Sequence, residues 1–279
     1  MCNKVAVEML MENLEKYRDG KLPVLQLEDQ ENMLMHIGDP NCYLRDELIY
    51  QSFGKLIISN QLNANELEKL LAQLKQDDYL FYGIGEQGTD SVFTRSFSVL
   101  VIAAIIEYDV LEYQLSNQVL EHTVKRVVEY MLTEKDTRGF VEGKGWAHAI
   151  AHGADALDAL AKHPEMKTEN RTEILHAIEH SLLRKVDYLD EEEERLAIII
   201  SSLLKHQDAE KAIQLWIEKI MGIVETKLQE NQVPIEAYHT KRTVKSFLKS
   251  VYIILESKEQ GQKVKKYIFE ILENWMYLR

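Results

Sequence analysis

Apolar side chains recur every three to four positions along almost the whole chain, and this period is typical of amphipathic helices. No segment alternates strictly between apolar and polar residues over the length of a strand. The four prolines, at positions 23, 40, 164 and 234, all fall between the periodic segments, where a missing N–H costs little. The pattern therefore predicts about twelve helices, at residues 3–17, 29–37, 43–59, 64–75, 91–108, 115–133, 146–162, 169–186, 191–205, 209–227, 236–256 and 261–277.

Three of the predicted helix starts, near residues 146, 191 and 236, are 45 residues apart. This is the length of a two-helix repeat unit of the HEAT type, although no similarity between the units is visible residue by residue. Long helices joined by short loops favour antiparallel neighbours. We therefore expect an all-α fold, a right-handed α–α superhelix of HEAT- or armadillo-like helix pairs, in a single domain over residues 1–279.

Charge and composition exclude some classes of protein. The chain has 33 Lys and Arg against 46 Asp and Glu, a formal net charge of −13, which argues against a nucleic-acid partner. Apolar residues make up 46% of the 279 residues, which excludes intrinsic disorder. The two cysteines, Cys2 and Cys42, cannot form a disulfide framework, and this indicates a reducing compartment.

No targeting or membrane segment is evident from the sequence. Glu8, Glu12 and Glu15 interrupt the apolar residues of the N-terminal segment, which therefore does not resemble a secretory signal. The longest uninterrupted apolar runs, Val99–Ile106 and Leu196–Ile200, are far shorter than the roughly 20 residues of a spanning helix. We expect a soluble, cytoplasmic protein with no membrane partner.

One nucleotide-binding motif is misleading here. Residues Gly83–Gly88 spell G-x-G-x-x-G, and Glu107 follows about 20 residues later. A dinucleotide site needs this motif between a strand and a helix of a βαβ unit, and no parallel-sheet pattern is present. We expect no Rossmann fold, although the loop could present N–H groups to an anion at a helix N-terminus.

The segment with the most candidate chemistry is a glycine-rich loop that leads into an alanine-rich helix. If the helix begins near residue 146, His148, His152 and Asp155 lie within a narrow face at 100° per residue, and Trp146 lies on the opposite, core face. Two His four residues apart can bind one divalent metal, with Asp155 as a third ligand or as a partner of His152. The same trio could act as a metal-free acid–base pair, or form an ordinary solvated polar face.

Buried charge gives a second set of candidates. Arg95 lies on a helix that is apolar nearly all round, so it needs a carboxylate or a bound anion. Asp46 lies on an otherwise apolar helix stripe, and whether it pairs with Arg95 is left open. Asp136 and Lys144, in the glycine-rich loops, could complete a binding site with Arg95, Asp46 and Trp146, or could simply cap helices.

Three blocks carry a resemblance to a known family. Residues 45–50 (RDELIY), residues 90–98 (DSVFTRSFS) and residues 144–155 (KGWAH, then His152 and Asp155) resemble the signature blocks of an uncharacterised bacterial helical family, domain of unknown function 2785. The resemblance implies an all-helical superhelical fold. It implies no activity and no catalytic residue.

Three functions are compatible with these residues. The first is a binding or scaffold protein that holds a peptide or protein partner in a concave groove. The second is a metal-assisted hydrolase that uses His148, His152 and Asp155, with Arg95 or Lys144 on an anionic substrate. The third is a carbohydrate-active enzyme with Trp146 as a platform and carboxylates such as Asp136 and Glu142. Whether the protein is an enzyme stays open.

Overall fold

The computed structural model describes residues 2–186, 188–207, 209–230 and 234–276. Within these residues the chain forms twelve α-helices, one π-helical segment and one short hairpin, so the all-α prediction is confirmed. The elements are α1 (Cys2–Arg18), α2 (Leu27–Met35), η1 (Tyr43–Tyr50, a π-helix continuous with α3), α3 (Gln51–Ile58), α4 (Ala64–Leu74), α5 (Ser91–Glu112), α6 (Asn117–Thr133), β1 (Phe140–Val141), β2 (Gly145–Trp146), α7 (Ala149–Lys162), α8 (Thr168–Leu183), α9 (Glu192–Leu203), α10 (Ala209–Leu228), α11 (Ile235–Ser257) and α12 (Gln262–Trp275).

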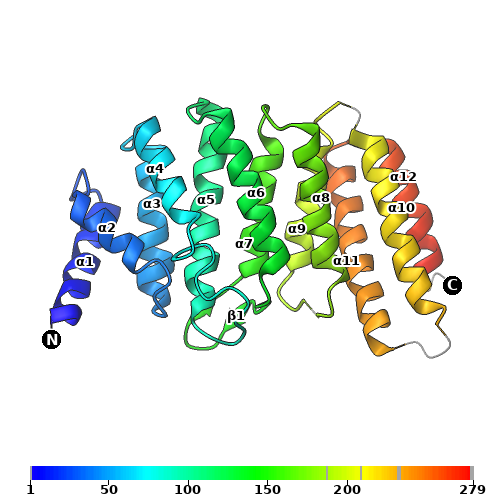
Figure 1. Cartoon of the computed structure of the whole chain (residues 1–279), viewed down its shortest axis with the longest axis horizontal. Helices are drawn as coiled ribbons and strands as arrows, with labels where there is room; N and C mark the ends of the chain where they lie inside the picture. The colour runs from blue at the N-terminus through cyan, green and yellow to red at the C-terminus, as the bar shows by residue number, and fades with distance from the viewer. Residues whose placement is uncertain (1, 187, 208, 231–233, 277–279) are drawn as a thin grey trace.

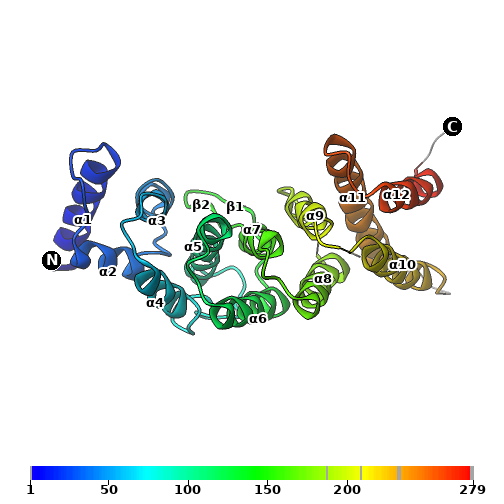
Figure 2. The ribbon, with the colours of Figure 1, turned by 90° about the horizontal axis from the view of Figure 1, so that it is seen from above.

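The helices stack side by side along one axis, with the two termini at opposite ends (Figure 1). Helices α3, α5, α7, α9 and α11 contact one another in this order and form one layer. Helices α4, α6, α8 and α10 form a second layer on the convex side, and the array curves so that the first layer lines its concave side (Figure 2). Helices α7, α9 and α11 begin 43 residues apart, close to the predicted spacing. The right-handed superhelical sense and the HEAT-like pairing stay predictions.

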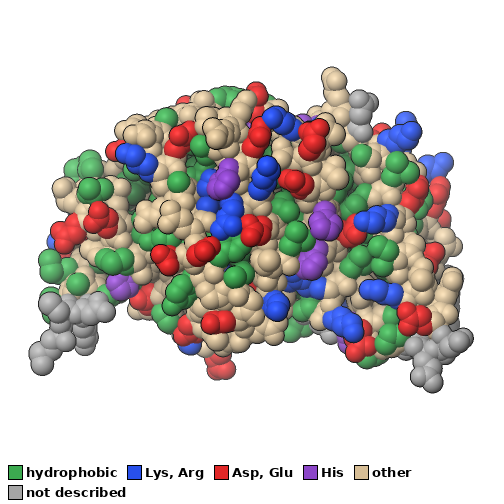
Figure 3. Space-filling model, viewed as in Figure 1, with side chains coloured by type: hydrophobic (Ala, Val, Ile, Leu, Met, Phe, Trp, Pro, Cys, Tyr) green, Lys and Arg blue, Asp and Glu red, His purple; other side chains and the backbone are tan. Residues whose placement is uncertain are grey.

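One cluster of buried apolar side chains runs through the array from Leu10 in α1 to Leu272 in α12. Burial of each large apolar side chain contributes about 1.5–3 kcal/mol, so this cluster is the main source of stability. The outer face of the second layer carries charges of both signs among scattered apolar side chains, as expected for a solvated surface (Figure 3). The single-domain organisation stays a prediction.

Helix α5 is the central element. It is apolar on almost every side, and among the described residues it is the one helix long and apolar enough to cross a membrane by length and composition. Its apolar window is 67% buried, because α5 packs against α3, α4 and α7. This burial is consistent with the core helix of a soluble protein.

Two predicted helices begin differently from the expectation. The predicted helix at 43–59 starts as the π-helix η1 before it continues as α3. The predicted helix at 146–162 begins only at Ala149, because Gly145 and His148 both have positive φ angles, 80° and 46°, that do not fit a helix. The residues before it form the β1–β2 hairpin, in which Phe140 pairs with Trp146.

A close approach between two backbone segments explains why position 38 is a glycine. A Cβ atom at Gly38 would lie 2.6 Å from the Cα of Thr94 in α5, and this backbone cannot move independently of the helix. We therefore expect Gly38→Ala to reduce the free energy of unfolding by about 1–3 kcal/mol, as overpacking does. Gly54→Ala is the matched control, since a Cβ there meets nothing within 4 Å. Alanine is favoured over glycine inside a helix by about 1 kcal/mol, so we expect this variant to be at least as stable as the wild type. Urea denaturation measures both, and equal stabilities of the two variants would contradict the prediction.

A buried lysine links α4 to α6. Lys75 is 5% exposed and its Nζ donates to Thr123 Oγ1 at 2.9 Å. Burial, and then the charge of Arg126, lower the pKa of Lys75 to about 8. The unfolded chain therefore binds more protons than the folded protein between pH 8 and 10.5, and stability rises with pH in this window.

Replacement of this lysine tests the linkage. Between pH 8 and 10, we expect the wild-type protein to gain about 1.4 kcal/mol per pH unit relative to Lys75→Met. Guanidinium denaturation at each pH measures the difference, with the exposed Lys69→Met as the control that follows the wild-type curve. Parallel curves for wild type and Lys75→Met would refute the pKa assignment.

Candidate functional site

His148 lies just outside α7, at its N-cap position, with a left-handed backbone (φ 46°). A non-glycine residue in this region is uncommon and is held there by its surroundings. Its ring stacks on the Trp146 ring, with 4.3 Å between centroids and 5° between planes. The predicted placement of Trp146 on the core face of a helix is therefore wrong. Trp146 lies in β2, and its side chain is 42% exposed.

The two histidines and four aromatic rings form a continuous series along the concave layer, which we term the aromatic row. Neighbouring ring centroids in this series lie 4.3–6.3 Å apart. Such edge-to-face and stacked contacts stabilise ring positions as well as burying area. In order along the series, the members are Phe140, Trp146, His148, His152, Phe97 and Tyr50.

A buried carboxylate faces His148. Glu192, in the first turn of α9, is 1% exposed, and its Oε2 accepts the backbone N–H of Asp190 at 3.1 Å. Its Oε1 lies 3.7 Å from Nδ1 of His148, and both atoms are buried without a hydrogen-bond partner. Sequence reasoning missed this residue, because Glu192 is one of four consecutive glutamates at a helix start and no local signal marks it as the buried one.

His152 has its ring fixed by a backbone acceptor. Its Nδ1 lies 3.2 Å from the carbonyl oxygen of Ser96, which can only accept, so Nδ1 carries the proton and Nε2 has a free lone pair. Burial, and then the neighbouring His148, lower the pKa of His152 to about 3. The imidazole is therefore neutral at neutral pH.

Asp155 has a different partner from the two histidines. Its Oδ1 accepts from Arg195 of α9 at 2.8 Å; burial raises the pKa of Asp155, and Arg195 opposes this shift. Within the described part of the chain, no group of three or more His, Cys, Asp or Glu side chains is placed to hold a metal ion. The predicted trio thus shares one region of the molecule without converging on one point.

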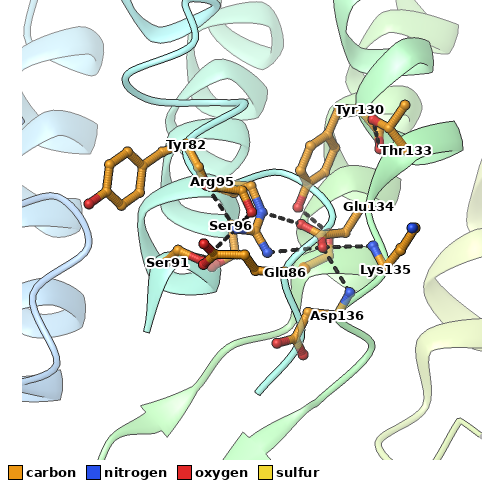
Figure 4. Close-up of polar contacts among 12 residues, drawn as sticks. Tyr82, Glu86, Ser91, Arg95, Ser96, Tyr130, Thr133, Glu134, Lys135 and Asp136 are labelled. Atoms are coloured by element: carbon orange, nitrogen blue, oxygen red, sulfur yellow. Dashed lines mark hydrogen bonds and ion pairs between the residues drawn. The ribbon is translucent and has the colours of Figure 1, made fainter. Parts of the chain in front are cut away.

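Arg95 has a structural partner. Its guanidinium is fully buried, and Nε and Nη2 donate to the two oxygens of Glu134 at 2.6 and 3.0 Å (Figure 4). Nη1 donates to the carbonyls of Tyr82 and Gly83 and to Ser91 Oγ. The open question of an Asp46–Arg95 pair is thereby answered, since every assigned partner of Arg95 lies elsewhere.

Asp46 pairs with its neighbour Arg45, at 2.7 Å between Oδ1 and Nε. Arg45 is itself fully buried under Phe93 and Phe97, and it donates to the carbonyls of Asp39 and Lys144. Burial lowers the pKa of Arg45 and raises that of Asp46. Arg45 therefore ties the hairpin to η1. Sequence reasoning missed Arg45, although it is the first residue of the block at 45–50.

The other predicted binding residues are also engaged. The Lys144 Nζ contacts both oxygens of Asp90, at 2.6 and 2.7 Å. Asp136 is 2% exposed; burial would raise its pKa, but hydrogen bonds from Arg138 and from the N–H of Gly88 outweigh it and lower the pKa. The G-x-G-x-x-G loop thus donates an N–H to the carboxylate of Asp136 in its own chain. No strand precedes this loop in the described residues.

An opening of the concave layer lies between α3, α5 and α7, and we term it the concave groove. Its volume is about 690 Å³, with Gly54, Ala103 and Ala104 among its lining residues. Tyr50 and Asp155 also line it, so the concave groove meets the aromatic row at Tyr50. Asp136 lines a separate cavity of about 820 Å³ between loops, so Asp136 and Asp155 do not line the same pocket.

Comparison with known families supports the resemblance found in the sequence. A family described as "Protein of unknown function (DUF2785)" matches residues 80–252. The chain belongs to this family. The matched residues of this DUF2785 member include the two blocks with Asp90–Ser98 and Lys144–Asp155, whereas Arg45–Tyr50 lies before them. No curated protein and no solved structure matches the chain.

Loss of the Glu134 charge should destabilise the protein strongly. Glu134→Gln leaves the buried Arg95 guanidinium uncompensated, and we expect a loss of about 3–5 kcal/mol in the free energy of unfolding. The control is Glu129→Gln in α6, since Glu129 is 51% exposed and its pair with Arg126 contributes less than about 1 kcal/mol. Equal losses for the two variants in urea denaturation would show that the Arg95 pair is not structurally dominant.

Proposed function

We propose that this DUF2785 protein is a binding protein, and that the concave groove holds an apolar peptide segment that carries Lys or Arg. The observation that carries the proposal is the groove itself: an opening of about 690 Å³ on the concave layer, within the usual range for ligand sites. Gly54, Ala103 and Ala104 leave room for the partner's side chains. Exposed apolar side chains stand at its rim, Ile58 at 74% and Leu111 at 75% exposure.

The length of the groove suits a peptide. The α5 residues that line it run from Leu100 to Glu112, which is about 18 Å at 1.5 Å per residue. A partner helix of about twelve residues covers this distance, with apolar anchors on one face. The aromatic row extends the same surface beyond Tyr50 towards the exposed Trp146 and Phe140.

The charge of the groove favours a basic partner. Its lining includes Glu107, Glu112, Asp155 and Asp158 against one cation, Lys162. Lys162 is held by Glu107 and Asp158, at 3.1 and 2.8 Å, so it does not face a ligand as a free charge. Complementary potential mainly raises specificity and the association rate, and it excludes acidic segments.

The cytoplasm is the proposed location. Two cysteines in 279 residues favour a reducing compartment, and Cys42 is an exposed free thiol.

A groove-filling variant tests the proposal. Peptides of about twelve residues are selected from a random display library on the wild-type protein, and the enriched sequences are made synthetically. We expect enrichment of apolar residues with Lys or Arg, and at least about a tenfold weaker Kd for Gly54→Leu, by fluorescence anisotropy. Gly222→Leu in α10 is the matched control, because a side chain there also meets open space but lies outside the groove.

Two outcomes would overturn the proposal. One is the absence of any selected peptide whose binding differs between Gly54→Leu and Gly222→Leu. The other is enrichment of acidic peptides, which would contradict the charge argument.

A further inference from the structure

The two histidines of the aromatic row share one feature: each ring has its Nδ1 side turned to an acceptor of the protein. Nδ1 of His152 donates to the Ser96 carbonyl at 3.2 Å. Nδ1 of His148 faces Oε1 of Glu192 at 3.7 Å, and no other described acceptor hydrogen-bonds to it. Metal-binding histidines almost always show this arrangement, in which a carboxylate or a carbonyl orients the ring and leaves the second nitrogen for the metal.

We propose that His148 and His152 bind one first-row transition-metal ion through their Nε2 atoms. Imidazole nitrogen suits Zn²⁺, Ni²⁺ and Cu²⁺, whereas Ca²⁺ and Mg²⁺ require oxygen ligands. The site is distinct from the concave groove and does not depend on the peptide proposal.

Glu192 gives an independent observation. Its carboxylate is 1% exposed, and Oε1 has no hydrogen-bond partner although it points at His148. An unpartnered buried oxygen is costly, because it has lost its hydrogen bonds to water without replacement. A metal on Nε2 makes the Nδ1–H of the same ring a stronger donor, so the ring and the carboxylate are drawn into a hydrogen bond and this cost is removed.

The placement of the rings fits a shared ion. Their centroids lie 5.8 Å apart and their planes are tilted by 57°. Two imidazoles that each place nitrogen at about 2.0–2.1 Å from one metal have centroids about 5–6 Å apart. The stacked Trp146 and the edge contact of Phe97 hold the two rings from either side, so little reorganisation is required.

The Nε2 atoms are open to a ligand. Among the described residues, no hydrogen bond uses Nε2 of either ring. Neither Nε2 atom is shut off from solvent, whereas Nδ1 of His148 is buried without a partner. Asp155 is held by Arg195 and does not complete a group of three protein ligands. The protein therefore supplies two ligands, and water or a bound molecule supplies the others.

The test is a titration of untagged, chelator-treated full-length protein with Ni²⁺. Calorimetry measures the affinity, and NMR signals of the histidine rings show which residues bind. The chain offers a control, because His176 and His180 are the other pair four residues apart but are exposed on α8 and lack such acceptors among the described residues. We expect Ni²⁺ to broaden the ring signals of His148 and His152 at the lowest concentrations. The double variant His176→Ala/His180→Ala should keep this tighter binding.

Two variants at the site complete the design. His148→Asn should lose the tighter binding, and Asn tolerates the left-handed backbone, so the fold is kept. Glu192→Gln should weaken it by about 10–100-fold, the usual effect of removing an orienting carboxylate. Near-UV circular dichroism confirms the fold of each variant. Wild-type affinity in His148→Asn, broadening confined to His176 and His180, or no binding of Ni²⁺ at all would overturn the proposal.

Discussion

The buried ion pair between Arg95 and Glu134 joins the start of α5 to the residue that follows α6, in the central part of the helix array. A charge at this depth is stable only when its hydrogen-bonding groups are satisfied, and Arg95 finds these partners on three segments: the α4–α5 loop, the first turn of α5 and the residue after α6. Glu134 in turn accepts the N–H groups of Lys135 and Asp136 through Oε1. The path of the chain out of α6 towards the hairpin is therefore set by this pair.

A second buried arginine, Arg45, holds the turn between the two strands of the same hairpin. Arg45 reaches the carbonyl of Lys144 at 2.7 Å while its guanidinium lies under Phe93 and Phe97. The Arg95–Glu134 pair anchors the chain before β1, and Arg45 anchors the turn before β2. The hairpin lies over the concave layer (Figure 2). These contacts fix the backbone on both sides of the segment that carries Trp146 and His148.

Family membership leaves the function to be argued from the site, because the matching family carries no assigned activity. The concave layer offers two adjoining surfaces with different chemistry. One is an acidic, apolar groove between α3, α5 and α7, and the other is the imidazole pair of the aromatic row. Tyr50 belongs to both, so a peptide in the groove would lie beside the two histidines. Helical arrays commonly use the concave side in this way.

The sequence by itself determined the helices, since the apolar period and the prolines are local signals, and most predicted boundaries lie within three residues of the observed ones. It also identified Arg95 as a buried charge that needs a partner. Only the tertiary structure decided which partner, because Glu134 is 39 residues away and Glu192 is 44 residues from His148. The hairpin was missed for a related reason. Positive φ angles at Gly145 and His148 and the burial of Arg45 depend on packing between segments far apart in the chain, which no local periodicity encodes.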